Sequence, residues 1–436
     1  MGVRPSVDSG PGASDPDMGD SEVADLGPED GGYRGPPDPG PALPVVPAAF
    51  GFPQALENWR LASSSTDPWT FDWLNGTMPV PDLGVGPRNL TWVEAEVAED
   101  GSVSVPSGVR VYLAGTVTVA ETRRYVVSLD GYQLSVDGAV LPNDPYRTGR
   151  HLQPVVLEPG AHRFIARGDS VRGPPRLRIW RVDVPVVLNA LDATVPDLVR
   201  GSVERQPLGI HVANATGEPL VGWKARVFNG PFTFASARTS PPIPAGATTQ
   251  VAFDIFPRED LVGDTATITL SLEPPDGDTG YAVDINLSIV DGDAAHRRTF
   301  VSDMDQSVQY YGVVPPLDFD PSRDYALALS LHGAAVEAIG QARAYGAKDW
   351  AYIIAPTNRR PFGFDWQDWG RLDALEALEH AKSSFNIDPE QVHVTGHSMG
   401  GHGTWHLGVL HPDRFAVVAP SAGWPQYSLY GGQSDV

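Results

Sequence analysis

A short segment near the C-terminus, Gly396-His397-Ser398-Met399-Gly400, places a serine between two glycines in the pattern G-x-S-x-G. A serine on a sharp turn can act as an exposed nucleophile, and glycines two residues before and after it let neighbouring backbones approach closely. The pattern therefore predicts covalent catalysis by Ser398, with Gly396 and Gly400 setting the geometry of the turn. Taken alone, it is also compatible with a glycine-rich turn that has no chemical role.

The residues on either side of this segment predict the elements that would hold the serine. Residues 391–395 form a short apolar run typical of a buried strand, and residues 403–410 can continue as a helix. A strand that turns sharply into a helix is a nucleophile elbow. The N-terminal N–H groups of the helix would favour negative charge beside the serine.

A second glycine-containing loop lies upstream, where an apolar strand predicted over residues 325–331 leads into His332-Gly333-Ala334-Ala335. Backbone N–H groups from this loop and from the elbow could converge on one carbonyl oxygen. We expect the amides of Met399 and Ala334 to form this oxyanion hole, with Gly333 allowing the upstream loop to turn.

Two more elements separate the loop from the elbow. Residues 351–356 predict a strand, and residues 365–385 predict a helix with Leu372, Leu375 and Leu378 on one apolar stripe. The order of strand, loop, strand, helix, strand, elbow and helix is typical of a doubly wound α/β sheet.

Through these motifs, residues 298–424 resemble the front part of an α/β-hydrolase catalytic domain. The resemblance is to the branch of prolyl oligopeptidase-type serine peptidases and related bacterial esterases. The segments that carry it are residues 309–316, 331–334, 361–366, 396–401 and 420–424. It implies a serine hydrolase that cleaves a peptide or carboxylic ester bond through an acyl-enzyme on Ser398.

This sequence departs from the family at the catalytic triad. Its acid and then its histidine follow later strands, whereas this sequence ends at Val436. The histidines after the serine all fall on or at the end of the predicted elbow helix: His402, His406 and His411. Asp435, in a polar tail, is a poor candidate for the acid. We therefore expect a C-terminally incomplete hydrolase without its triad Asp and His, and very poor turnover.

Other chemistry finds little support in the sequence. His402 and His406 have the i, i+4 spacing of a metal pair, but no third ligand can be named, so we expect no metal site and no cofactor. A cluster after the strand at residues 351–356 could shape the pocket or form a packing corner: Arg359, Arg360, Asp365 and Trp366. Four N-x-S/T triplets matter only if a eukaryote secretes the chain, and they begin at Asn75, Asn89, Asn214 and Asn286.

Composition limits the partners. The 436 residues include 54 acidic and 31 basic side chains, a net charge of −23. Nucleic acid and anionic membrane surfaces attract basic proteins, so we expect neither as a partner. The sequence has no cysteine, which excludes disulfides, thiolate chemistry and cysteine-based zinc sites.

The sequence predicts a multidomain chain in which two all-β sandwich modules precede an incomplete α/β-hydrolase domain. Residues 1–44 are rich in Gly, Pro and Asp and predict disorder, because they hold too few apolar groups to offset the entropy of folding. A loop-rich lead-in at 45–88 follows. The β-sandwiches span 89–184 and 185–292, and the hydrolase domain spans 293–436.

Turn signals and alternation support the two sandwiches. Asp130-Gly131, Asp137-Gly138 and Pro159-Gly160 predict hairpins in the first, which is weakly similar to PA14-like and carbohydrate-binding jelly rolls. That similarity implies glycan binding, with a spacer module as the alternative. In the second, of immunoglobulin-like type, apolar residues alternate with polar ones over 268–272 and 283–289.

The sequence indicates the substrate and the cellular location of the protein only in general terms. We expect the substrate to be a peptide or an ester, with a glycan-linked one as an option, and the lack of propeller repeats favours an esterase or a less restricted peptidase. A rival interpretation is an inert glycan- or protein-binding β-sandwich protein that carries a hydrolase remnant. The domain types indicate a secreted or periplasmic protein, although residues 1–43 contain no apolar run that would suit a signal peptide or a membrane span.

Overall fold

The structure is a computed structural model. It describes residues 60–64, 82–85, 90–96, 98, 102–142, 150–170, 173, 176–182, 184–234, 237–277, 280–360 and 365–425. The segment predicted to be disordered, most of the lead-in, residues 361–364 and Asp435 lie outside this description. So do Asn75 and Asn89, the asparagines of two of the four N-x-S/T triplets.

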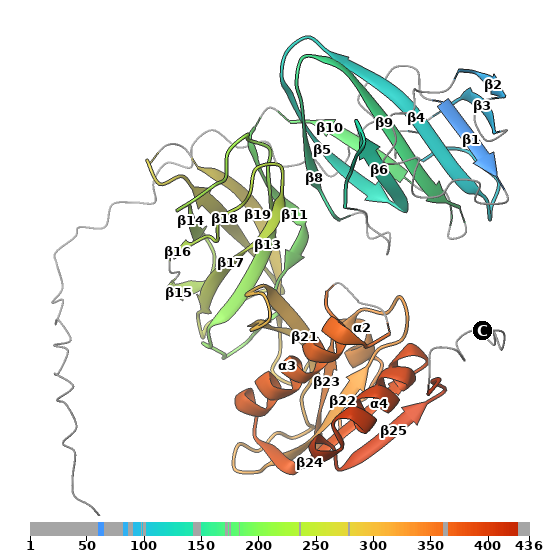
Figure 1. The fold of residues 1–436 in the computed structure, drawn as a ribbon. Coiled ribbons are helices and arrows are strands. Elements are labelled where there is room, and N and C mark those ends of the chain that lie inside the picture. The colour runs from blue at the N-terminus through green and yellow to red at the C-terminus, as the bar shows by residue number, and fades with distance from the viewer. Residues whose placement is uncertain are drawn as a thin grey trace, which may run out of the picture. The chain divides into compact units, whose positions relative to one another are not determined.

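The first β-rich region contains a seven-stranded and a three-stranded sheet (Figure 1). The larger sheet has the order β2 (Gly84–Val85), β3 (Thr91–Glu94), β1 (Arg60–Ser64), β4 (Arg110–Val119), β9 (Gly160–Asp169), β6 (Tyr132–Val136) and β7 (Ala139–Val140). The smaller has the order β10 (Arg176–Arg181), β5 (Arg123–Asp130) and β8 (Gln153–Leu157). Buried side chains from both sheets, including Leu134 and Val127, form one cluster.

Only one of the three predicted hairpins in this region forms. Asp137-Gly138 joins β6 to β7 with φ of 51° and 88°, and Val136 pairs with Ala139. Asp130-Gly131 and Pro159-Gly160 were predicted wrongly, because each connects strands that belong to different sheets. Strands that are neighbours in sequence there bury their apolar faces against each other across the core instead of pairing side by side.

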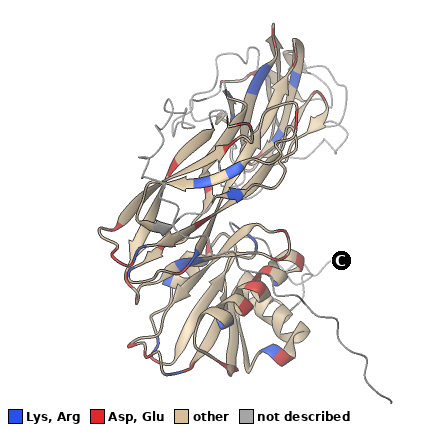
Figure 2. Ribbon diagram, turned by 90° about the vertical axis from the view of Figure 1, so that its left-hand side faces the viewer, with Lys and Arg blue, Asp and Glu red and all other residues tan. Residues whose placement is uncertain are grey.

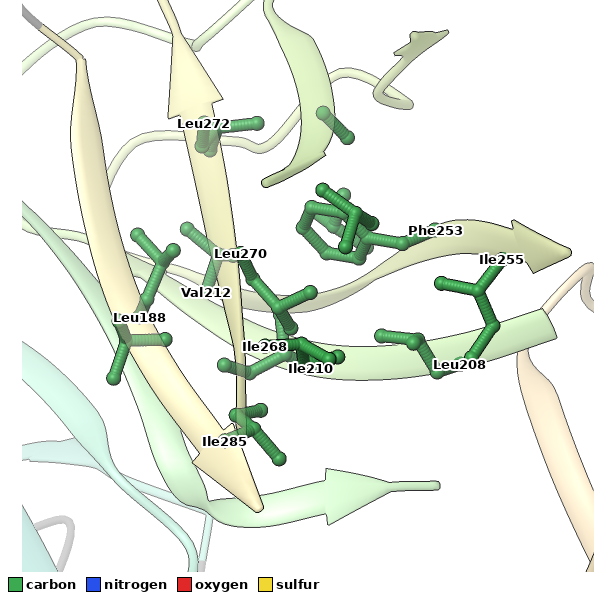
Figure 3. Close-up of a cluster of buried hydrophobic side chains, with 14 of the residues drawn as sticks. Leu188, Leu208, Ile210, Val212, Phe253, Ile255, Ile268, Leu270, Leu272 and Ile285 are labelled. Atoms are coloured by element: carbon green, nitrogen blue, oxygen red, sulfur yellow. The ribbon is translucent and has the colours of Figure 1, made fainter. Parts of the chain in front are cut away.

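The second β-rich region also contains two sheets. The four-stranded sheet has the order β11 (Val186–Thr194), β13 (Gln206–Asn214), β17 (Thr248–Pro257) and β15 (Phe232–Phe234). The five-stranded sheet has the order β12 (Leu198–Val199), β19 (Tyr281–Val290), β18 (Thr265–Glu273), β14 (Lys224–Phe228) and β16 (Arg238–Thr239). Figure 3 shows how side chains such as Ile210 and Leu270 meet between them. The predicted alternation is present in β19, where Val283, Ile285, Leu287 and Ile289 are buried and the residues between them are exposed. In β18 the apolar residues are buried as well, but so is Ser271.

Asn214 ends β13 with its side chain fully buried. Its amide group donates to the carbonyl oxygens of Glu218, Ile243 and Pro244 at 2.9, 3.0 and 3.1 Å, and its Oδ1 accepts from the backbone N–H of Thr216 at 2.9 Å. This asparagine therefore has a structural role within the fold. By contrast Asn286, in the middle of β19, is exposed.

The C-terminal region is built on a six-stranded sheet. Its order is β20 (His296–Val301), β21 (Val308–Val314), β23 (Ala351–Pro356), β22 (Tyr325–Leu331), β24 (Ile387–His397) and β25 (Val417–Ser421). The four strands from β23 to β25 are parallel, whereas β20 and β21 join antiparallel. This is the doubly wound order that the sequence predicts, with two antiparallel strands at one edge.

Helices cover both faces of this sheet. Ala342 of α2 (Ala338–Arg343) packs with Ile353 in one cluster. Leu378 of α3 (Asp368–Ser384) and Leu407 of α4 (Met399–Leu410) pack with Ile354 in another. Adjacent residues of β23 therefore enter opposite clusters, as expected for a parallel sheet buried on both sides. The 3-10 turn η2 (Pro412–Arg414) connects α4 to β25.

Helix α3 differs from its prediction. It begins at Asp368 rather than at residue 365, and Leu372 on the predicted stripe is 39% exposed. The buried face instead carries Gly370, Asp373, Ala374, Ala377, Leu378 and Ala381. Small alanines allow the helix to approach the sheet closely, so they occupy the interface in place of the larger leucine. The short helix α2 was not predicted.

Figure 2 shows acidic and basic residues interspersed along the described strands, turns and helices. Some form ion pairs between neighbouring strands, such as Arg226 with Glu273 at 2.7 Å. Pairs as exposed as this one contribute little to stability. None of the helices in the described part of the chain has the length and apolar character needed to cross a membrane.

Candidate active site

Ser398 lies at the turn between β24 and α4, with φ of 56° and ψ of −118°. A positive φ is unusual for a residue other than glycine and indicates strain that the surrounding structure must hold in place. Its backbone N–H donates to the carbonyl oxygen of Ser421 at 3.0 Å, which ties the turn to the end of β25. The residue is half-buried.

The glycines around the serine have no room for a side chain. A Cβ added at Gly396 would lie 2.7 Å from the carbonyl oxygen of Leu331 and would overlap the carbonyl of Gly400. A Cβ at Gly400 would overlap the Leu331 oxygen itself, and one at Gly401 would overlap the carbonyl oxygen of Ser421. Close packing of backbone on backbone is therefore what fixes the elbow.

The upstream loop passes directly beside the elbow. Leu331, at the end of β22, pairs with Gly396 of β24, so the residues after each strand emerge next to each other. A Cβ added at Gly333 would lie 3.5 Å from the carbonyl oxygen of His397 and 3.9 Å from the Cβ of Ser398. Met399 is buried and Ala334 is exposed. The fold thus brings both predicted oxyanion segments to the serine.

Ser398 and Gly333 lie at the part of the sheet where ligands usually bind in such folds. The strand after β22 in the chain, β23, lies on one side of β22, and β24 lies on the other. The strand order therefore reverses at β22. In open α/β sheets the crevice outside the carboxyl ends of the strands at such a reversal is where ligands bind. Strands β22 and β24, labelled in Figure 1, end at Leu331 and His397, so Gly333 and Ser398 both follow strands at this point.

The histidines after the serine are engaged elsewhere. The ring of His402 is buried and stacks on Trp424 with centroids 5.0 Å apart, and its Nδ1 lies 2.9 Å from the Trp424 carbonyl oxygen. Its Nε2 lies 3.2 Å from the amide nitrogen of Gln367. His406 stacks on His402, and burial lowers its pKa. In the part of the chain that the structure describes, no histidine is hydrogen-bonded to the Ser398 hydroxyl.

The other candidates in the sequence have structural contacts. Arg359 donates to the hydroxyls of Ser302 and Ser307, each at 3.0 Å, and pairs with Asp305. Arg360 pairs with Asp192 and also donates to Thr194. Within the described residues no cluster of three or more metal-ligating side chains is found, and His402 and His406 are held by packing contacts instead.

Asp373 is a buried acid that sequence reasoning missed. It lies on α3, where it accepts hydrogen bonds from the hydroxyl of Thr357 at 3.1 Å and from the backbone N–H of Arg359 at 3.0 Å. Burial raises the pKa of its carboxyl to about 6. Asp373 thereby holds the loop that follows β23. In the sequence it resembles any polar residue on a helix.

The comparisons with known proteins agree with this geometry. Residues 339–435 match a family model described as "Putative esterase". Over 145 residues the chain is 30% identical to an uncharacterized secreted protein of Arthroderma benhamiae, a match that covers 28% of this chain and 15% of that protein.

Two solved structures are also similar. An S-formylglutathione hydrolase from Staphylococcus aureus has 18% identity and a TM-score of 0.26, over 30% of this chain and 57% of that one. A thermostable esterase has 17% identity and a TM-score of 0.25, over 56% of this chain and 81% of that one.

The elbow, the sheet order and the family match together support a serine hydrolase domain in the C-terminal region. The match is to an esterase model, so it supports an α/β-hydrolase of the esterase kind and does not single out the prolyl oligopeptidase branch. The chain spans about 15% of the length of the curated relative that it matches.

Proposed function

We propose that the C-terminal domain hydrolyses carboxylic esters through an acyl-enzyme on Ser398. The observation that carries this proposal is the strained φ of 56° at Ser398, held at a strand-to-helix turn by glycines that no larger residue could replace. This turn lies within the residues that match the esterase model. The packing holds one serine in a strained conformation, next to a loop with backbone donors. Such an arrangement is typical of a catalytic nucleophile.

The reaction follows from the positions of the groups. The Ser398 oxygen attacks the carbonyl carbon of the ester, and the electron pair of the C=O bond moves onto the carbonyl oxygen. The N–H groups of Met399 and Ala334 and the N-terminus of α4 stabilise this oxyanion. The C–O bond to the alcohol then breaks, and the alcohol leaves with the proton that a base took from the serine. Water repeats the sequence on the acyl-enzyme and releases the acid.

The base and the acid of the triad have no assigned residue in this proposal. His402 is fixed by Trp424 and Gln367, and among the described residues no histidine forms a hydrogen bond with the serine hydroxyl. Loss of a triad base lowers the rate by several orders of magnitude. We therefore expect a chain of residues 1–436 to be acylated slowly by activated substrates and to turn over very poorly.

The finer features are part of the same proposal. Peptide hydrolysis uses the same chemistry, and the esterase match is the reason that we favour an ester. The two pairs of sheets are proposed to be β-sandwich modules with the boundaries predicted from the sequence, and the ester could then be presented on a glycan that they bind. An extracytoplasmic location is supported by the curated relative, which is named a secreted protein.

A fluorophosphonate probe tests the nucleophile, because it phosphonylates activated serines irreversibly. We expect one probe per chain after prolonged incubation, on the peptide that contains Ser398, and none in Ser398→Ala. The matched control is Ser421→Ala, since Ser421 lies at the end of the neighbouring strand and is not the proposed nucleophile. Labelling that persists in Ser398→Ala, or that never occurs in the wild type, would contradict the proposal. Repeated turnover of an activated ester would contradict the expected poor turnover.

A further inference from the structure

The turn that precedes α3 is strained over several residues. Asp365 and Trp366 both have φ of 58°, and Asp368 has φ of 41°. A bulky residue such as tryptophan rarely adopts a positive φ. Such backbone persists only where surrounding contacts fix it, and it is concentrated at functional sites. The contacts of this turn indicate what it does.

Trp366 is fully buried between the elbow helix and the upstream loop. A Cβ added at Gly403 would lie 2.5 Å from the Cγ of Trp366, so the indole ring rests directly on the backbone of α4. On the other side, its Nε1–H donates to the carbonyl oxygen of His332 at 3.1 Å. The two rings are also in contact, with centroids 4.9 Å apart.

His332 connects Trp366 to the loop of residues 332–335, which carries the proposed oxyanion donor Ala334. It is fully buried, and its ring nitrogens lie 2.9 Å from the carbonyl oxygen of Gly333 and 3.0 Å from that of Thr357. The Gly333 oxygen also accepts from the backbone N–H of Val336 at 3.3 Å. In a planar trans peptide, the carbonyl of Gly333 and the N–H of Ala334 point in opposite directions. Fixing that carbonyl therefore fixes the direction of the Ala334 donor.

The same turn contacts the residue that supplies the other donor. The backbone N–H of Asp365 lies 3.2 Å from the Sδ of Met399. Met399 is buried, and its amide follows the serine directly. One strained turn thus reaches both halves of the oxyanion hole, although its residues lie more than 30 positions from each of them in the sequence.

We propose that Trp366 is a positioning residue for the oxyanion hole: it holds the His332–Ala334 loop against α4 so that the Ala334 and Met399 donors converge on one oxygen. The catalytic meaning of this role rests on the function proposed above. The loop contact itself is a property of the folded chain and can be tested without any reaction.

Trp366→Phe is the variant that tests the contact, because it removes the Nε1–H and keeps an aromatic ring against Gly403. The control is Trp350→Phe, whose ring is 50% exposed and contacts His393. By hydrogen exchange on the full chain, we expect the amide of Val336, which donates to the carbonyl oxygen of Gly333, to exchange at least about tenfold faster in Trp366→Phe and at the wild-type rate in Trp350→Phe. Unchanged exchange in Trp366→Phe would overturn the proposal.

A kinetic measurement separates positioning from general loosening. With the fluorophosphonate probe, we expect the maximal rate of Ser398 phosphonylation to fall about 10- to 100-fold in Trp366→Phe. This is below the roughly 10²- to 10³-fold effect of deleting an oxyanion donor outright. The half-saturating probe concentration should not change. An unchanged maximal rate, or a change confined to half-saturation, would overturn the positioning role. A wild-type chain that never reacts would contradict the proposed function alone, because the exchange result is independent of it.

A third measurement does not depend on the variant folding. In the wild type, the indole N–H of Trp366 should exchange with solvent as slowly as the amide of Val336, because one opening of the loop exposes them together. The indole N–H of exposed Trp350 should exchange far faster. Equal exchange at the two indoles would show that the bond to His332 does not hold the loop, and would overturn the proposal.

Discussion

The α-carbon of Gly400 lies directly against the carbonyl oxygen of Leu331, so that a methyl group added to this glycine would overlap that oxygen. The first turn of α4 therefore packs directly against the end of β22. Because the upstream loop starts at His332, this one backbone contact places Ser398 next to the loop that we propose supplies the second oxyanion donor. The proposed catalytic geometry depends on it.

Gly400→Ala should therefore destabilise the hydrolase sheet. We expect the free energy of local unfolding, measured by hydrogen exchange in β22 and β24, to fall by at least about 2 kcal/mol, because neither backbone can move without displacing the turn. The control is Gly340→Ala in α2, where a Cβ would meet only a side-chain methyl of Val336 at 3.8 Å. Alanine there should be neutral or stabilising. Equal effects of the two substitutions would contradict the close contact at Gly400.

The strain at Ser398, the proposed nucleophile, predicts that glycine is a more stable replacement for this residue than alanine. Glycine adopts a φ of 56° without strain, whereas alanine retains most of it. We expect Ser398→Gly to be more stable than Ser398→Ala by about 1 kcal/mol, and both to be unreactive toward the fluorophosphonate probe. Hydrogen exchange in α4 measures the difference. If alanine were the more stable of the two, the backbone of the elbow would not be strained.

The raised pKa of the Asp373 carboxyl predicts that the stability of the C-terminal region depends on pH. Burial raises its pKa from 3.8 to about 6, so the folded chain keeps this proton at pH values where the unfolded chain has lost it. The stability that the protonated carboxyl contributes is complete below about pH 4 and is lost as the pH rises through about 6. Two units of pKa correspond to about 3 kcal/mol.

Asp373→Asn isolates this effect, because asparagine does not titrate and can still accept the bonds from Thr357 and Arg359. We expect the stability of the variant relative to the wild type to increase by up to about 3 kcal/mol between pH 4 and pH 7. Hydrogen exchange in α3 and β23 at several pH values gives this difference. A difference that stays constant with pH, or that decreases, would contradict the raised pKa.

Asn214→Ala should strongly destabilise the second β-rich region. The substitution removes a fully buried side-chain amide that donates to three carbonyl oxygens, one of them, on Ile243, in the buried core. We expect a loss of about 3 kcal/mol, measured by hydrogen exchange in β13. Asn286→Ala is the matched control, since this asparagine is exposed and its Oδ1 accepts from the Thr267 hydroxyl. It should cost less than about 1 kcal/mol. Similar losses for both would contradict the structural role of Asn214.

The sequence by itself determined the features that depend on residues close together in the chain. The elbow was predictable because a sharp strand-to-helix turn needs small residues two positions before and after Ser398, and the sequence has glycine at both positions. The alternation in β18 and β19 and the order of strands and helices were predictable because each element has its own hydrophobic period. Each of these signals is local.

Only the tertiary structure decided how those elements meet. Asp130-Gly131 and Asp137-Gly138 are the same dipeptide, yet only the second closes a hairpin, because pairing depends on which sheet can bury the next strand. Asp373 has the sequence pattern of a surface residue, and its burial follows from how closely α3 approaches β23. The contact of Trp366 with His332 joins residues 34 positions apart, and no local pattern specifies it. The sequence thus indicated a nucleophile, and the packing of distant segments determined the surroundings in which it could act.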